Sequence, residues 1–141
     1  MNDSDYANIA VSSRFSATQV SLSQTDSVEA YLTLTNQGSA PIQLTFNSGQ
    51  LYDIYLYDAA GEIVSRWSQG HMFTQACQQI ILEPGQEKVF GDRLELKDLS
   101  GQRLGEGVFL LKIELQASLS ASGQLFQVHP FTAETSLNLV P

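Results

Sequence analysis

The fold is decided by residues 46–85, which read FNSGQLYDIYLYDAAGEIVSRWSQGHMFTQACQQIILEPG. Two runs in this stretch, 51–58 and 62–67, have strand character and are separated by Asp-Ala-Ala-Gly. Alternation with a period of two is typical of half-buried strands, and Gly61 suits the left-handed residue of a tight turn. The stretch therefore predicts a β-hairpin. It is followed by a long loop over residues 68–79, with one helical turn near 73–78, and by a Pro-Gly turn.

The rest of the chain repeats this strand pattern. Apolar residues alternate over 28–35 and 109–117, and turn residues recur every 8–14 positions without an amphipathic helix. This spacing predicts an all-β fold, an immunoglobulin-like antiparallel β-sandwich of seven to nine strands. We expect one domain over residues 9–141, a flexible tail over residues 1–8, and Trp67 between the two sheets. The last strand, 125–140, is expected to be interrupted near Pro130 by a bulge or kink.

Composition excludes several classes of protein. The 141 residues carry a net charge of −8, and the seven Lys and Arg residues form no cluster, which disfavours nucleic-acid binding. Cys77 is the only cysteine, so no intramolecular disulfide forms. No apolar run is long enough to span a membrane, and the first residues do not resemble a signal peptide. A leader removed earlier would leave the same sequence, so the compartment stays open.

Catalytic and metal-binding motifs are not found in the sequence. No Gly-x-Ser-x-Gly nucleophile elbow occurs, and His71 and Cys77 have no visible orienting carboxylate. Two histidines 58 positions apart and one cysteine make no metal-ligand spacing. We therefore expect a non-catalytic protein without a cofactor or metal.

The central stretch resembles the intracellular proteinase inhibitor (BsuPI) family. The resemblance covers roughly residues 28–117 and depends on the order of several short motifs. These are Asn36 after an alternating strand, the run 46–53, Asp58 and Gly61, Arg-Trp-Ser at 66–68, Phe-Thr-Gln at 73–75, Leu-Glu-Pro-Gly at 82–85, and Gly105-x-Gly107 before Phe109. The resemblance implies an immunoglobulin-like sandwich, a cytoplasmic location, and inhibition of a serine protease of the subtilisin class.

The loop after Trp67 contains the first candidate contact residues. An inhibitor that mimics a substrate needs an exposed, rigid segment with one prominent side chain. His71, Met72 and Phe73 are the candidates for binding a partner, and Met72 or Phe73 would suit an apolar specificity pocket. The alternative is that Phe73 folds back into the sandwich, which leaves Met72 as the exposed residue.

Two further interpretations remain open for other residues. Arg103 and Leu104, expected at the tip of the loop 99–106, form a second candidate contact, or a plain connection. Tyr52, Asp53, Arg66 and Trp67 are expected to be structural, with Asp53 and Arg66 paired across neighbouring strands, although a recognition patch is the alternative. A different function is also open: an adhesion or structural module that recruits a partner or a second copy through an edge strand such as 131–140.

Overall fold

The structure, a computed structural model, describes residues 9–121 and 124–141. The expected flexible tail, residues 1–8, lies outside them. The described residues form ten strands and no helix, so the predicted count of seven to nine was too low. The strands are β1 (Ile9–Phe15), β2 (Gln19–Ser21), β3 (Ser27–Asn36), β4 (Ile42–Phe46), β5 (Asp53–Tyr57), β6 (Ile63–Arg66), β7 (Gln78–Leu82), β8 (Glu87–Glu95), β9 (Gly107–Ala121) and β10 (Gln124–Val140).

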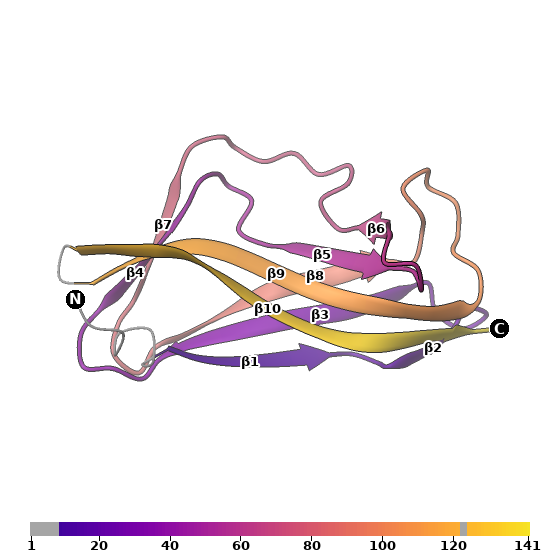
Figure 1. Cartoon of the computed structure of the whole chain (residues 1–141), viewed down its shortest axis with the longest axis horizontal. Coiled ribbons are helices and arrows are strands. Elements are labelled where there is room, and N and C mark those ends of the chain that lie inside the picture. The colour runs from indigo at the N-terminus through magenta and orange to yellow at the C-terminus, as the bar shows by residue number, and fades with distance from the viewer. Residues whose placement is uncertain (1–8, 122–123) are drawn as a thin grey trace.

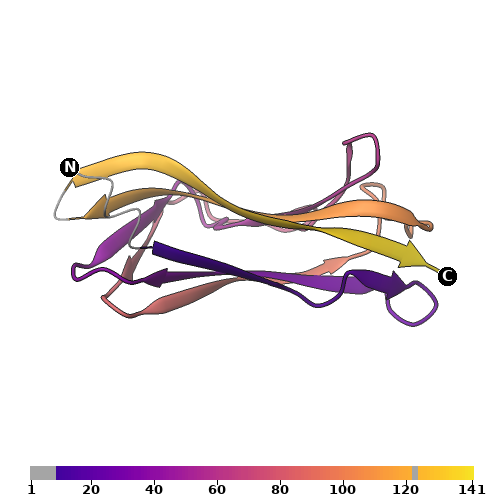
Figure 2. The same cartoon turned by 60° about the horizontal axis from the view of Figure 1, so that its bottom comes forward.

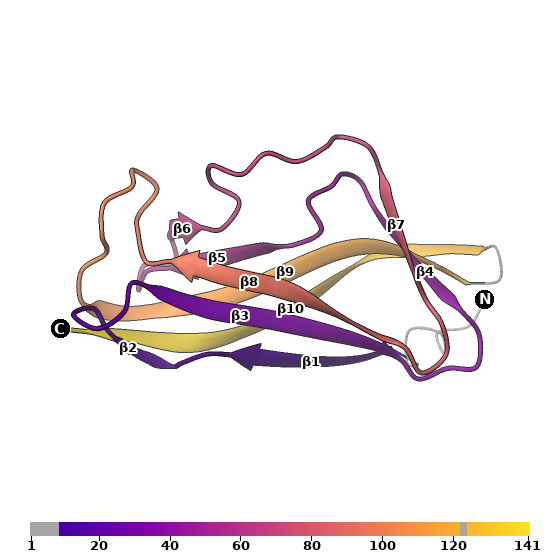
Figure 3. The same ribbon diagram turned by 180° about the vertical axis from the view of Figure 1, so that it is seen from behind.

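These strands form two sheets that lie over one another as two layers (Figure 2). The smaller sheet has three strands in the order β1-β3-β8, which Figure 3 shows from its own side. The larger sheet has seven strands: the path β2-β10-β9-β4-β7, with β5 paired to both β9 and β6. Both sheets join strands that are distant in sequence: β3 neighbours β8 in the smaller sheet, and β4 neighbours β9 in the larger one.

The core fills the space between the two layers. Every second residue of β3 from Val28 to Asn36 is buried, as a period-two pattern predicts for a strand with one covered face. The larger sheet contributes buried leucines and isoleucines from β4, β5 and β9. The largest fully buried side chains are Leu32, Leu34, Leu44, Phe46, Ile54, Leu56, Leu82, Leu96, Leu111, Ile113 and Leu115.

Two strands, β4 and β5, pair with β9 at different points along it, and the candidate site lies between these two arms. One end of β9 pairs with β4 through residues 118–120, and the other pairs with β5 through residues 110–114. The β4–β5 and β6–β7 connections both emerge between these arms, at the top of Figure 1. They touch there, because the Gly49 N–H donates to the Thr74 carbonyl over 2.8 Å.

Several local predictions need correction. β2 pairs with β10 in parallel, so the larger sheet is mixed rather than antiparallel. No helical turn forms near 73–78. Instead β7 begins at Gln78, because Phe46 at the end of β4 has its ladder partner there. The irregularity in β10 lies between Leu125 and Val128, whereas Pro130 stays in register opposite Gln116.

The proposed edge strand 131–140 is not a free edge throughout. It lies in β10, which pairs with β9 along its length and with β2 at residues 138–140. Among the described residues, no helix is long and apolar enough to cross a membrane.

Candidate protein-contact loop

The most elaborate exposed feature is the connection from β6 to β7, residues 67–77, here called the 67–77 loop. It begins with two tight turns: the Gln69 N–H donates to the Arg66 carbonyl over 3.2 Å, and the His71 N–H to the Ser68 carbonyl over 3.0 Å. Gly70 has a φ of 81°, a left-handed conformation that favours glycine. The turns reverse the chain and carry it outward from β6.

A stack of rings holds the middle of the loop. The Trp67 ring lies 4.6 Å from Tyr52 and 4.4 Å from His71, both nearly parallel, and 5.7 Å from Phe73. Because the residues on both sides of Met72 contact the tryptophan, the methionine side chain itself is turned to solvent. Met72 is 97% exposed, the highest value among the exposed large apolar residues.

Asp53 fixes the start of the loop from the first residue of β5. One carboxylate oxygen accepts hydrogen bonds from the N–H groups of Ile54 (2.9 Å) and Ser68 (3.0 Å), and the other from the Ser68 hydroxyl (2.6 Å). The Arg66 guanidinium lies 3.8 Å away, where it forms an ion pair. Asp53 is buried, so its charge is satisfied by these donors rather than by water.

Trp67 lies at the margin of the two sheets, which corrects the expected position between them. Its side chain is partly buried and packs against the core, and its backbone N–H donates to the Ile54 carbonyl over 2.8 Å. The neighbouring Tyr52 hydroxyl reaches across to the Gly91 carbonyl of β8 (3.0 Å). Burial, helped by the negative charge of Asp92, raises the pKa of Tyr52 to about 12.

The later part of the loop is held by close contact with the β4–β5 connection. A Cβ added to Gly49 would lie 2.4 Å from Cγ2 of Thr74 and 3.2 Å from its backbone nitrogen. Together with the Gly49–Thr74 backbone hydrogen bond, this leaves no space for a side chain at position 49. Cys77 is exposed, and its thiol lies 3.9 Å from the Asn47 carbonyl.

The second candidate loop, residues 96–106, lies beside the first. The Gln69 side chain donates to the Leu99 carbonyl over 2.8 Å and ties the two loops together. Asp98 closes the turn by accepting hydrogen bonds from Ser100 and from the Gln102 N–H. The Ser100 hydroxyl is the largest of several hydrogen bonds that lower the pKa of Asp98.

Arg103 and Leu104 do not form the tip of this loop, contrary to the sequence-based expectation. The tip is the turn from Asp98 to Gly101. The Arg103 guanidinium is bound to the Leu22 carbonyl (2.6 Å), and Leu104 is partly buried against the core. Arg103 is exposed, but its guanidinium is turned back onto the chain, and Leu104 is half-buried.

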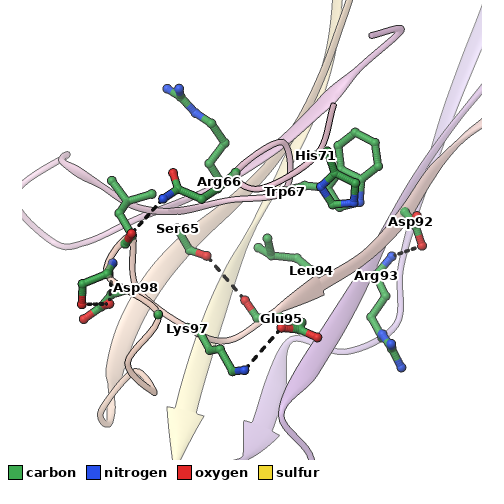
Figure 4. A pocket seen from close by; sticks show the side chains of 14 residues that line it. Ser65, Arg66, Trp67, His71, Asp92, Arg93, Leu94, Glu95, Lys97 and Asp98 are labelled. Carbon is green, nitrogen blue, oxygen red and sulfur yellow. Dashed lines mark hydrogen bonds and ion pairs between the residues drawn. The ribbon is translucent and has the colours of Figure 1, made fainter. Parts of the chain in front are cut away.

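A cleft of about 490 Å³ separates the 67–77 loop and β6 from β8 and the second loop. Figure 4 shows the rings of Trp67 and His71 at one end of it, and the Lys97–Glu95 ion pair (3.6 Å) below. No buried side-chain nitrogen or oxygen in the described part of the chain lacks a hydrogen-bond partner. The described residues also contain no group of three His, Cys, Asp or Glu side chains that could hold a metal.

The fold and site define an all-β protein of two sheets with one braced and exposed loop. The family model of the intracellular proteinase inhibitor BsuPI matches residues 15–119, and the chain belongs to this family. A comparison with curated proteins gives no match.

Several solved structures match most of this chain at low sequence identity and with TM-scores below 0.5. They include a β-glucosidase, EmGH1, from Erythrobacter marinus (19% identity, TM-score 0.45, 94% of this chain and 15% of that chain). Spo0M, a sporulation control protein from Bacillus subtilis, has 12% identity and a TM-score of 0.48 over 95% of this chain and 50% of its own. The putative ApaA protein from Bordetella pertussis has 16% identity and a TM-score of 0.43, covering 94% and 92%. This chain thus spans only 15% of the glucosidase, and similarity at this level assigns it no function.

Proposed function

We propose that the chain inhibits an intracellular serine protease of the subtilisin class, with the 67–77 loop in the substrate groove and Met72 in the specificity pocket. Membership of the proteinase inhibitor family supports the class of partner. The observation that carries the proposal is the 97% exposure of Met72 between two ring side chains that contact Trp67. The protein itself acts without catalysis, on an immunoglobulin-like scaffold.

Rigidity is the physical reason to prefer this loop. An inhibitor that binds like a substrate loses affinity whenever its contact segment must be ordered on binding, at roughly 0.5–1.5 kcal/mol per immobilised side chain. Here the order exists beforehand. Asp53 holds the first residues, the ring stack holds the middle, and the Gly49–Thr74 contact holds the end.

The chemistry of Met72 also suits the role. Its side chain is unbranched, apolar and adaptable in shape, so it can fill a mostly apolar pocket without an unsatisfied polar group. Arg103 and Leu104 are unsuited, since the first is bound to Leu22 and the second is partly buried. The Leu99 turn, tied to Gln69, stands next to the loop as flanking surface.

Titration of a subtilisin-class protease with the purified protein tests the proposal. The wild-type chain is expected to inhibit reversibly, Met72→Leu to retain inhibition, and Met72→Asp to weaken it by at least about 100-fold, as burial of an unpaired charge requires. Val108→Asp is the matched control, because Val108 is also exposed (63%) but lies on β9, away from the loop.

Two results would refute different parts of the proposal. No inhibition by the wild-type chain at micromolar excess would discard the inhibitor function. Inhibition that Met72→Asp and Val108→Asp weaken equally would discard the loop as the contact site and retain the function.

A further inference from the structure

The two outer edges of the three-stranded sheet differ in how their backbone groups are satisfied. On β8, the Leu96 N–H just past the strand bonds toward β3, to the Asp26 carbonyl. Backbone direction alternates along a strand, so the odd-numbered residues of β8 point away from β3. These are the groups that another strand could reach.

Side chains cap three backbone groups on the outer edge of β8, all between residues 91 and 95. The Gly91 carbonyl accepts from the Tyr52 hydroxyl (3.0 Å), the Arg93 N–H donates to Asp92 (2.7 Å), and the Glu95 carbonyl accepts from the Ser65 hydroxyl (3.4 Å). Tyr52 lies just before β5, and Ser65 lies in β6 of the other sheet. Occupied edge groups discourage the addition of a further strand.

Within the described part of the chain, no side chain caps the outer edge of β1 in this way. The Ser16 N–H, just past β1, donates to the Glu29 carbonyl of β3, so the backbone groups of Ile9, Val11, Ser13 and Phe15 point outward by the same alternation. Among the described residues, no hydrogen bond reaches these outward groups. Figure 3 shows β1 at the border of the sheet, with β3 on one side only.

The side chains of β1 do not shield this edge. Val11 lies opposite buried Leu34 in the ladder, but it is itself 46% exposed. Arg14 is the only charged residue in the strand, and its guanidinium lies 4.6 Å from the Tyr31 ring centre, back over the sheet. An edge without caps or an outward charge is a template for strand addition.

We infer that β1 pairs with β1 of a second copy of this chain, antiparallel, about a two-fold axis at Ser12. The sequence of β1 is self-complementary in this register. Ile9 lies opposite Phe15, and Val11 lies opposite Ser13. The outward N–H and C=O groups of these four residues therefore hydrogen-bond to those of the second copy. Arg14 lies opposite Ala10, so no like charges meet, and the contact closes as an isologous dimer.

The register makes Ser12 a specific probe of the interface. Ser12 lies opposite its own copy, at a pair that is not hydrogen-bonded and whose side chains are therefore close. Its side chain is exposed, so a charge there is tolerated in the single chain. Ser12→Lys or Ser12→Asp alone places like charges opposite one another, whereas a mixture of the two places opposite charges there.

Analytical ultracentrifugation over a range of protein concentrations tests the inference. The wild type is expected to dimerise, and each Ser12 variant alone to dissociate about fivefold more readily at low salt. The equimolar mixture should restore the dimer. Val89→Lys is the control, because Val89 is exposed on the capped strand β8, and it should dimerise like the wild type.

A second variant removes a hydrogen bond instead of adding a charge. Ser13→Pro deletes an outward N–H without removing a bond to β3, and should leave a folded monomer, as judged by circular dichroism. Should that variant unfold, the Ser12 charge exchange decides alone. A wild type that stays monomeric at every concentration, or Ser12 variants that dimerise like Val89→Lys, would overturn the inference.

Discussion

Ser68 donates both its backbone N–H and its hydroxyl to the carboxylate of Asp53, over 3.0 and 2.6 Å. The two residues are fifteen positions apart, at the start of β5 and just past the end of β6. Their contact therefore joins the strand that lies beside β9 to the first turn of the 67–77 loop. These hydrogen bonds fix the start of the loop to β5, and through β5 to β9.

Replacing Asp53 should destabilise the protein through this contact. Asp53→Ala leaves two backbone N–H groups and a hydroxyl without their acceptor, and we expect it to lower the free energy of unfolding by about 2–4 kcal/mol. Asp53→Asn keeps one acceptor oxygen and should cost about half as much. Urea denaturation measures both. Equal losses for the two variants would show that the charge, and not the acceptor geometry, stabilises the loop.

The contact between Gly49 and Thr74 gives a prediction about inhibition. A methyl group at position 49 would collide with Cγ2 of Thr74, so Gly49→Ala should displace the end of the 67–77 loop. We expect inhibition to weaken about tenfold, because the loop must then be ordered on binding. Protease titration measures this loss.

A second substitution provides the control for this collision. Thr74→Ser removes Cγ2 and keeps the hydroxyl that accepts the Ala76 N–H over 3.2 Å. The double variant should therefore recover much of the lost inhibition. If it is as weak as Gly49→Ala alone, the collision is not the cause.

Strands could be predicted from the sequence, but their ends could not. The alternation over 28–35 identified β3, since one face of it is covered throughout. Alternation from residue 51 also suggested a strand, yet β5 begins only at Asp53, opposite Glu114 of β9. Strand ends are set by where a partner strand is available, and a local pattern carries no information about that partner.

The candidate site could be predicted only in part, because local sequence carries no information about contacts between distant segments. An exposed apolar side chain in an aromatic loop follows from local sequence, and Met72 is exposed. The contact of Gly49 with Thr74 joins segments 25 positions apart, and no sequence motif indicates it. The misplaced tip of the second loop had a usable signal, because Asp-Leu-Ser-Gly at 98–101 is typical of a turn closed by the aspartate side chain.

Gly91 should be far less tolerant of substitution than other glycines. It has a φ of 146°, and an added Cβ would lie 2.2 Å from the Ala30 carbonyl and 2.7 Å from Tyr31. We expect Gly91→Ala to lower the free energy of unfolding by about 3 kcal/mol or more, because β3 would have to move. Gly105→Ala is the control: it meets nothing within 4 Å and should change stability by less than about 1 kcal/mol. Thermal unfolding of both variants measures the difference, and similar melting temperatures would contradict the expectation.

Stability at alkaline pH should report on Tyr52. Burial raises its pKa to about 12 from an ordinary value of 10.0, so the folded state favours the neutral phenol. This contribution is complete below pH 10 and is lost as the pH rises from 10 toward 12, where the unfolded chain ionises first. The phenolate also cannot donate to the Gly91 carbonyl.

Tyr52→Phe separates this effect from the other tyrosines, since Tyr31 and Tyr55 also have raised pKa values. The variant should lose about 1 kcal/mol at neutral pH with its hydrogen bond. Its unfolding free energy should then fall less steeply than that of the wild type between about pH 10 and about pH 11. Urea denaturation at stepped pH measures the two slopes. Parallel curves would mean that Tyr52 ionises as easily in the folded chain as in the unfolded one, and that its burial at the sheet margin does not exclude water.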